Sequence, residues 1–118
     1  MINAVHTVIY TTNAEADRAF FRDVLKLPAV DAGQGWLIFA LPPGELGIHP
    51  TDSANENGRH QLYLMCDNLE QTTAELKAKG VEFTQRITEQ RWGRLTAFKL
   101  PGGSELYLYE PKHASPLR

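Results

Sequence analysis

The sequence contains very little cysteine and no long hydrophobic run. Cys66 is the single cysteine among 118 residues, so no internal disulfide can form and no oxidising compartment is indicated. No stretch approaches the roughly 20 apolar residues that cross a bilayer, and the opening MINAVHTVIY lacks the basic and apolar regions of a signal peptide. We therefore expect a soluble, cytoplasmic protein in which Cys66 acts as a small, buried hydrophobic side chain.

An excess of either charge is also absent. Twelve Lys and Arg residues stand against 14 Asp and Glu residues, for a net charge of -2. This balance argues against nucleic acid or an anionic membrane as the main partner. The chain is 42% hydrophobic and long enough for one domain with a core, but too short for two. The expected partner is a small molecule or another protein.

The first half of the chain reads as a strand, a helix and three short strands. Residues 5–12 are rich in β-branched and aromatic types, which favours a strand. Asn13 is a suitable N-cap for a helix over residues 14–27, where apolar side chains recur at spacings of three and four. Pro28 ends this helix. The three further strands are expected at residues 29–32, 36–41 and 45–49.

The second half repeats this order after a polar, turn-rich linker at residues 50–59. A strand is expected at residues 60–66, followed by a helix that Asp67 or Asn68 caps and that Gly80 closes. The remaining strands are expected at residues 81–87, 94–100 and 105–109.

The two halves align in register. His6 and His60 are 54 residues apart, and so are Asn13 and Asp67, which follow them. Such a duplication usually means two similar units that pair their sheets. The expected division of the chain into parts is residues 4–49 for a first βαβββ module, 50–59 for the linker, 60–111 for a second βαβββ module and 112–118 for a tail.

These features resemble the vicinal oxygen chelate superfamily, which includes glyoxalase I, bleomycin resistance proteins, fosfomycin resistance proteins and extradiol dioxygenases. The resemblance extends over roughly residues 4–111. It rests on the paired His-x6-Asn/Asp units and on the segments FFRDVLKLP, AELKAKGVEF and LPGGSELYLYEP. It implies an α+β fold in which two βαβββ modules form a cup-shaped mixed sheet around a small-molecule site, in a chain that forms a homodimer.

The resemblance also implies where a divalent metal would bind. In the family, ligands come from the head of the first strand and from the last strand of each module, and His6 and His60 match the first-strand positions. The glutamate of the closing motif falls on Tyr107 here, and its counterpart in the first module is Gly47. Because residues two apart on a strand share a face, His49 is a third candidate ligand. Three histidines suit Zn, Fe, Ni or Mn with one position open.

The last strand has two faces of different character. Alternation places Glu105, Tyr107 and Tyr109 on one face and Leu106 and Leu108 on the other. We expect the leucines to turn toward the helices and the other three side chains to face the cup.

These positions suggest roles. Tyr107 and Tyr109 are candidates for pocket walls that orient a ligand through their hydroxyl groups. Trp92 stands beside a glycine in a turn and is a candidate lid. Glu105 is the candidate catalytic residue for moving a proton, and Glu110 is a second carboxylate that could do so.

Two functions stay open at this point. Paired His6 and His60 favour an enzyme, a metal-dependent lyase, isomerase or dioxygenase acting on a substrate with vicinal oxygens. Tyr107 in place of a glutamate, together with Gly47, favours a metal-free protein that binds and sequesters a drug or metabolite, as bleomycin resistance proteins do.

Overall fold

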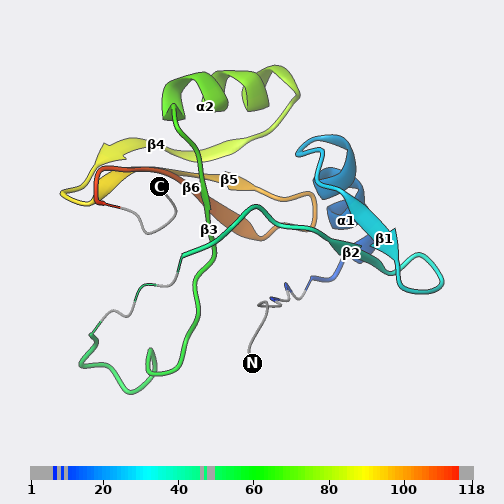
Figure 1. Cartoon of the computed structure of the whole chain (residues 1–118), viewed down its shortest axis with the longest axis horizontal. Coiled ribbons are helices and arrows are strands. Elements are labelled where there is room, and N and C mark those ends of the chain that lie inside the picture. Colours follow the sequence, from blue (N-terminus) through cyan, green and yellow to red (C-terminus); the bar gives the residue numbers. More distant parts are fainter. Residues whose placement is uncertain (1–6, 8, 10, 46, 48–49, 115–118) are drawn as a thin grey trace.

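The computed structural model describes residues 7, 9, 11–45, 47 and 50–114. In this part of the chain there are two helices and six strands, and Figure 1 shows their arrangement. The elements are α1 (Ala14–Asp23), β1 (Ala29–Asp31), β2 (Leu37–Phe39), β3 (Tyr63–Met65), α2 (Leu69–Ala78), β4 (Phe83–Glu89), β5 (Gly93–Lys99) and β6 (Glu105–Pro111). The predicted α+β class is confirmed, and the second half has the predicted βαβββ order.

The larger sheet is mixed and open. Its strand order is β3-β6-β5-β4, with β3 parallel to β6 and the other neighbours antiparallel. Strands β1 and β2 form a separate antiparallel pair. The predicted strands at residues 5–12 and 45–49 lie largely outside the described residues.

The first helix is shorter than its apolar pattern predicts. Asn13 caps it as expected, because its Oδ1 accepts from the N–H of Ala16 at 3.2 Å. The helix ends at Asp23 rather than at residue 27, and Lys26 adopts a positive φ of 59°. The N–H of Leu25 bonds to the carbonyl of Phe20, a pattern typical of a chain leaving a helix. The apolar spacing thus continues through a turn that packs against the core without being helical.

The second helix has both predicted ends. Asn68, rather than Asp67, is the N-cap, and its Oδ1 accepts from the N–H of Gln71 at 3.0 Å. Lys79 is the C-cap, and Gly80 follows with a φ of +89°, a conformation that glycine adopts without strain.

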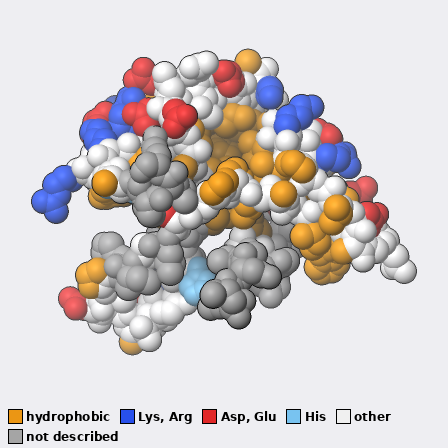
Figure 2. Space-filling model, viewed as in Figure 1, with side chains coloured by type: hydrophobic (Ala, Val, Ile, Leu, Met, Phe, Trp, Pro, Cys, Tyr) orange, Lys and Arg blue, Asp and Glu red, His pale blue; other side chains and the backbone are white. Residues whose placement is uncertain are grey.

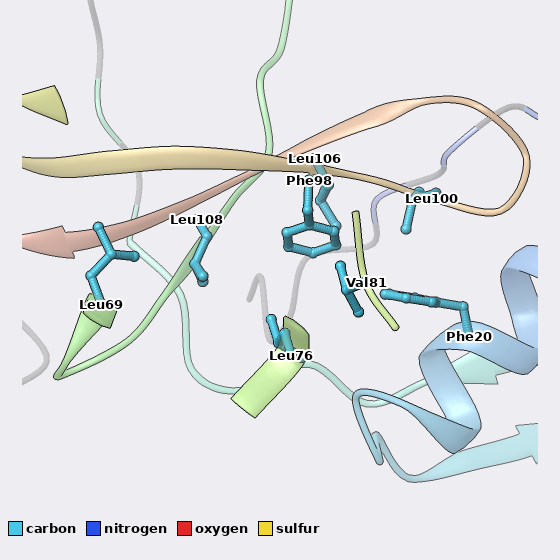
Figure 3. Packing of buried hydrophobic residues seen from close by; sticks show 8 residues of the cluster. All are labelled: Phe20, Leu69, Leu76, Val81, Phe98, Leu100, Leu106 and Leu108. Carbon is cyan, nitrogen blue, oxygen red and sulfur yellow. The ribbon is translucent and has the colours of Figure 1, made fainter. Parts of the chain in front are cut away.

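Among the described residues, a hydrophobic core joins both helices to the larger sheet (Figure 3). Its buried members are Phe20, Leu69, Leu76, Val81, Phe98, Leu100, Leu106 and Leu108. Leu106 and Leu108 face α2, which confirms the predicted inward face of β6. The ring of Phe20 lies 5.9 Å from that of Phe98, so α1 packs on the same core as α2. Neither of the two helices in the described part of the chain covers the opposite face of the sheet, which carries the candidate site.

The predicted strand at residues 60–66 is also shorter than expected. Strand β3 begins at Tyr63, and His60 lies in irregular chain before it. Among the described residues, no helix has the length and apolar character needed to cross a membrane.

Candidate functional site

Three tyrosine rings gather on the face of the larger sheet that turns away from α2. Tyr63 on β3 is the register partner of Tyr107 on β6, and their ring centroids lie 5.2 Å apart. Tyr109, two residues further along β6, meets the Tyr63 ring edge-on at 5.7 Å. Alternation along the strands explains this, because Leu106 and Leu108 occupy the face toward α2.

Trp92 completes this group from the turn between β4 and β5. Its ring lies 5.7 Å from that of Tyr109 and 6.3 Å from that of Tyr63. The turn is held by hydrogen bonds in both directions between the backbones of Gln90 and Gly93. Trp92 keeps 41% of its surface exposed, so it forms an accessible rim. We refer to Tyr63, Trp92, Tyr107 and Tyr109 as the aromatic cluster.

The structure brings together the three predicted pocket residues, Tyr107, Tyr109 and Trp92, and adds Tyr63. The alternation of HQLYLMC could have indicated Tyr63, since Leu62 and Leu64 flank it and pack against the core. Which strand would lie beside β3 is not visible in the sequence.

A polar group adjoins the aromatic cluster. The Tyr109 hydroxyl donates to Oε1 of Glu45 at 2.8 Å. Nε2 of His113 lies 3.4 Å from the Tyr109 hydroxyl and 3.5 Å from Oε1 of Glu45. The Glu45 side chain is only 14% exposed. We call Glu45, His113 and the Tyr109 hydroxyl the polar edge, and it supplies hydrogen-bonding groups next to an apolar surface.

Sequence reasoning did not select Glu45 or His113 as site residues. Glu45 begins the strand predicted at residues 45–49, and His113 lies in the tail. Glu45 reaches Tyr109 through long-range folding, since it is 64 positions from it in sequence, whereas His113 follows Tyr109 by four positions.

Burial changes the acidity of Tyr63. Desolvation raises the pKa of its phenol, and the neighbouring Tyr107 adds to this effect. The phenol therefore stays protonated, and it donates to Oε1 of Gln61 at 2.8 Å. Tyr63 thus offers the cluster a neutral ring rather than a charged group.

The predicted metal ligands are only partly placed. His6 and His49 lie outside the described residues, and His60 is exposed in the irregular chain before β3. Within the described ranges, no three His, Cys, Asp or Glu side chains come together in a way that could hold a metal ion. These described side chains alone therefore do not fit a divalent metal centre.

The two candidate carboxylates of β6 occupy different environments. Glu105 is exposed at the start of the strand and accepts a hydrogen bond from the Thr84 hydroxyl. Glu110 points toward α2, where its Oε1 accepts from the N–H of Leu69 at 2.9 Å. Glu110 thus serves the N-terminus of α2 rather than the aromatic cluster.

Two hollows lie away from the aromatic cluster. One, of about 400 Å³, is lined by residues of α1, of the turn after α2 and of the end of β5. The other, of about 480 Å³, lies beside the turn at residues 102–104.

Figure 2 shows charged side chains mainly around the border of the view, with hydrophobic side chains gathered nearer its centre. We place the candidate site at the aromatic cluster because Tyr63, Trp92 and Tyr107 are at least partly exposed, with Tyr109 buried behind them, and such rings can stack on a flat ligand without an enclosed cavity.

Comparison with known proteins agrees with this architecture. The model of the Glyoxalase/Bleomycin resistance protein/Dioxygenase superfamily matches residues 3–111. No curated protein matches the sequence significantly.

Several solved structures have a similar fold. A lactoylglutathione lyase from Agrobacterium tumefaciens is similar with a TM-score of 0.63 and 17% identity, over 92% of this chain and 94% of that chain. An antibiotic-binding protein from Streptomyces gives a TM-score of 0.62 and 21% identity, over 95% and 100% of the two chains. A member of the superfamily from Sphaerobacter thermophilus gives a TM-score of 0.59 and 27% identity, over 92% of this chain and 98% of that chain. Because the family model covers nearly the whole sequence, the chain belongs to the glyoxalase, bleomycin resistance protein and dioxygenase superfamily.

Proposed function

We propose that the protein binds and sequesters a small drug or metabolite with a flat aromatic body. The aromatic cluster is the observation that carries this proposal. Its four rings belong to three separate segments of the chain and lie on a face that neither α1 nor α2 covers. Aromatic side chains combine a large apolar surface with preferred stacking geometries, and each ring pair contributes roughly 0.5–1.5 kcal/mol beyond its buried area.

The polar edge gives such a ligand an orientation. Glu45 accepts hydrogen bonds, the Tyr109 hydroxyl donates to it, and His113 offers Nε2, because its Nδ1 donates to the carbonyl of Ala114. Ligand sites commonly combine an apolar wall with a few polar groups that fix the pose. The similar fold of an antibiotic-binding protein supports a role in binding.

A fluorescence titration tests this proposal. Trp36 and Trp92 are the two tryptophans, so a Trp36→Phe variant emits from Trp92 alone, inside the aromatic cluster. Anthraquinone-2-sulfonate is a suitable flat probe, and camphor-10-sulfonate is its non-planar control with the same charge. We expect saturable quenching by the flat probe only.

Variants locate the binding surface. Tyr107→Ala in the Trp36→Phe background should weaken binding about tenfold, because one stacking contact is lost. Phe39→Ala is the matched control, since this ring packs on Phe21 outside the aromatic cluster. Equal affinity in the Tyr107→Ala protein, or no saturable quenching at all, would refute the proposal.

A second candidate function is catalysis by a lyase, isomerase or dioxygenase. The polar edge favours it, because a carboxylate, a phenol and an imidazole within hydrogen-bonding reach can move protons. The fold that the chain shares with a lactoylglutathione lyase is a further reason to consider it. The metal-dependent form of this hypothesis needs His6, His60 and His49 as ligands.

Metal analysis separates the two functions. Tag-free protein is dialysed against Zn, Fe, Ni and Mn salts, and its metal content is measured. About one retained metal per chain, lost in His6→Ala and His60→Ala but kept in His113→Ala, would favour the enzyme. Protein that retains no metal but binds the flat probe would favour sequestration.

We also propose that the protein is a homodimer. Val30, Trp36 and Leu41, in and beside β1 and β2, are 68%, 59% and 44% exposed. Exposed apolar side chains gathered in one region are typical of association surfaces. Sedimentation velocity should show a dimer that Val30→Glu weakens, and a monomeric wild-type protein would contradict this.

A further inference from the structure

Glu89 holds together two elements that border the aromatic cluster. It is the last residue of β4, and its register partner across the turn to β5 is Arg94. Its Oε1 accepts from Nε of Arg94 at 2.7 Å. Its Oε2 accepts from Nζ of Lys112, the residue that follows β6. One carboxylate thus joins the hairpin that carries Trp92 to the segment that carries His113.

The backbone brings the same two elements close together. The N–H of Lys112 donates to the carbonyl of Trp92 at 2.9 Å. Gly93 is paired with Pro111, and a Cβ built on Gly93 would lie 2.7 Å from the carbonyl oxygen of Glu110. Glycine leaves room for this approach because it has no Cβ. The turn between β4 and β5 and the end of β6 therefore lie side by side (Figure 1), and a side chain that fixes one restrains the other.

The ion pairs of Glu89 belong to a connected group. Arg94 also reaches Glu70 at the start of α2, where its Nη2 lies 2.7 Å from Oε1. The Arg94 side chain is only 21% exposed, so salt screens its charge less than at an open surface. Hydrogen bonds from Lys112 and Arg94 keep the pKa of Glu89 below its usual value, and its carboxylate is therefore ionised at neutral pH. Isolated surface pairs contribute little, whereas several charges joined in this way can hold a fixed geometry.

Trp92 and His113 both stand outside regular strands and need such support. The Trp92 ring is 41% exposed and meets the rings of Tyr63 and Tyr109 edge-on. His113 follows Lys112 directly, and its Nε2 lies 3.4 Å from the Tyr109 hydroxyl. The rim of the aromatic cluster and one member of the polar edge are thus carried by the two segments that Glu89 joins.

We propose that Glu89 is a positioning residue of the candidate site, which sets the places of Trp92 and His113 through Arg94 and Lys112. The inference rests on the proposed function in assigning the aromatic cluster to ligand binding, whereas the position of Trp92 is a property of the free protein. Glu89 is not part of the aromatic cluster, and its side chain is 61% exposed. Its loss should therefore lower affinity without removing a stacking contact.

The ligand-free protein gives the first test. In the Trp36→Phe background, where Trp92 is the single tryptophan, Glu89→Gln should move the emission to longer wavelength and lower its anisotropy. The physical reason is that the turn becomes more mobile and more hydrated when its link to the end of β6 is lost. Glu70→Gln is the matched control and should leave both signals unchanged, because it removes the other ion pair of Arg94 and keeps both bonds of Glu89.

Ligand affinity in the same background gives the second test. Glu89→Gln should weaken the binding of anthraquinone-2-sulfonate about threefold. The direction is diagnostic, because loss of a nearby negative charge would by itself tighten the binding of an anionic probe. Glu70→Gln removes the same charge and should not weaken binding. Lys112→Met should act like Glu89→Gln, and Lys112→Arg should bind like the wild type, because it keeps the positive charge.

Two results would overturn the proposal. One is emission and anisotropy of Trp92 that are the same in Glu89→Gln as in Glu70→Gln. The other is saturable binding of the probe that Glu89→Gln leaves unchanged or tightens. If the wild-type protein shows no saturable quenching, the proposed function fails, and the ligand-free signals of Trp92 decide the role of Glu89. If Glu89→Gln fails to fold, Lys112→Met replaces it in both measurements.

Discussion

The Tyr109 hydroxyl donates a hydrogen bond of 2.8 Å to Oε1 of Glu45 across 64 residues of sequence. Tyr109 lies on the last strand of the larger sheet, whereas Glu45 belongs to the first half of the chain. The bond therefore ties the first half to the aromatic cluster and fixes the position of the polar edge.

Removing this hydrogen bond should weaken the fold measurably. In Tyr109→Phe the ring stays, but a mostly buried carboxylate loses a donor, at a cost of about 1 kcal/mol and a fall in Tm of roughly 4 °C. A double-mutant cycle with Glu45→Ala, followed by urea unfolding, measures the coupling of the pair. Additive effects of the two substitutions would show that the bond contributes nothing to stability.

The ring of Tyr63, rather than its hydroxyl group, should contribute most to ligand binding at this position. The Tyr63 ring contacts Tyr107, Tyr109 and Trp92, while its hydroxyl donates to the nearby Gln61. We expect Tyr63→Phe to bind the flat probe like the wild type and Tyr63→Ala to bind it about tenfold more weakly. Fluorescence titration in the Trp36→Phe background gives both values. Strong loss in Tyr63→Phe would instead assign the binding energy to the hydroxyl.

The Cys66 thiol should react slowly in the folded protein. Burial raises its pKa, so less of the reactive thiolate is present at neutral pH than in an exposed cysteine. Its Sγ also lies 3.8 Å from the carbonyl oxygen of Tyr109. Alkylation by iodoacetamide should be slower in native than in urea-unfolded protein and should accelerate as the pH rises past the ordinary thiol pKa. Mass spectrometry reports it directly, because Cys66 is the only cysteine. Equal rates in both states would contradict the assigned environment.

Glu110 should act as a structural residue. Its Oε1 accepts from the N–H of Leu69, which opens α2 and has no solvent exposure, so water cannot easily replace the carboxylate. We expect Glu110→Ala to lower the free energy of unfolding by about 1–2 kcal/mol in urea titrations.

Two variants control this measurement. Glu110→Gln keeps an oxygen that can accept the hydrogen bond. It should therefore lose less stability than Glu110→Ala, because it removes only the interaction of the charge with the helix dipole. Glu105→Ala, at an exposed position of the same strand, should have a smaller effect than Glu110→Ala. Loss of ligand binding without loss of stability in Glu110→Ala would show that Glu110 belongs to the site after all.

Local patterns predicted the elements whose causes are local. The second helix begins at Asn68 and is followed by Gly80 because a side-chain cap and a residue free to adopt positive φ act within a few positions. The alternation in ELYLY likewise predicted the side of β6 that enters the core. The prediction placed the end of α1 at residue 27, but the helix ends at Asp23. Apolar spacing indicates which side chains are buried and does not distinguish a helix from the turn that follows it.

The sequence by itself determined the α+β class, the order of elements in the second half and the placement of Tyr107 and Tyr109 on the face away from α2. Only the tertiary structure decided that Tyr63 stacks on Tyr107, that Glu45 meets the Tyr109 hydroxyl, and that Asp17 reaches Gly102. The physical reason is how far apart in sequence the interacting residues lie. Capping and alternation depend on neighbours in sequence, whereas these contacts depend on which strands pair and how the two halves pack, and that is fixed by burial of the shared core.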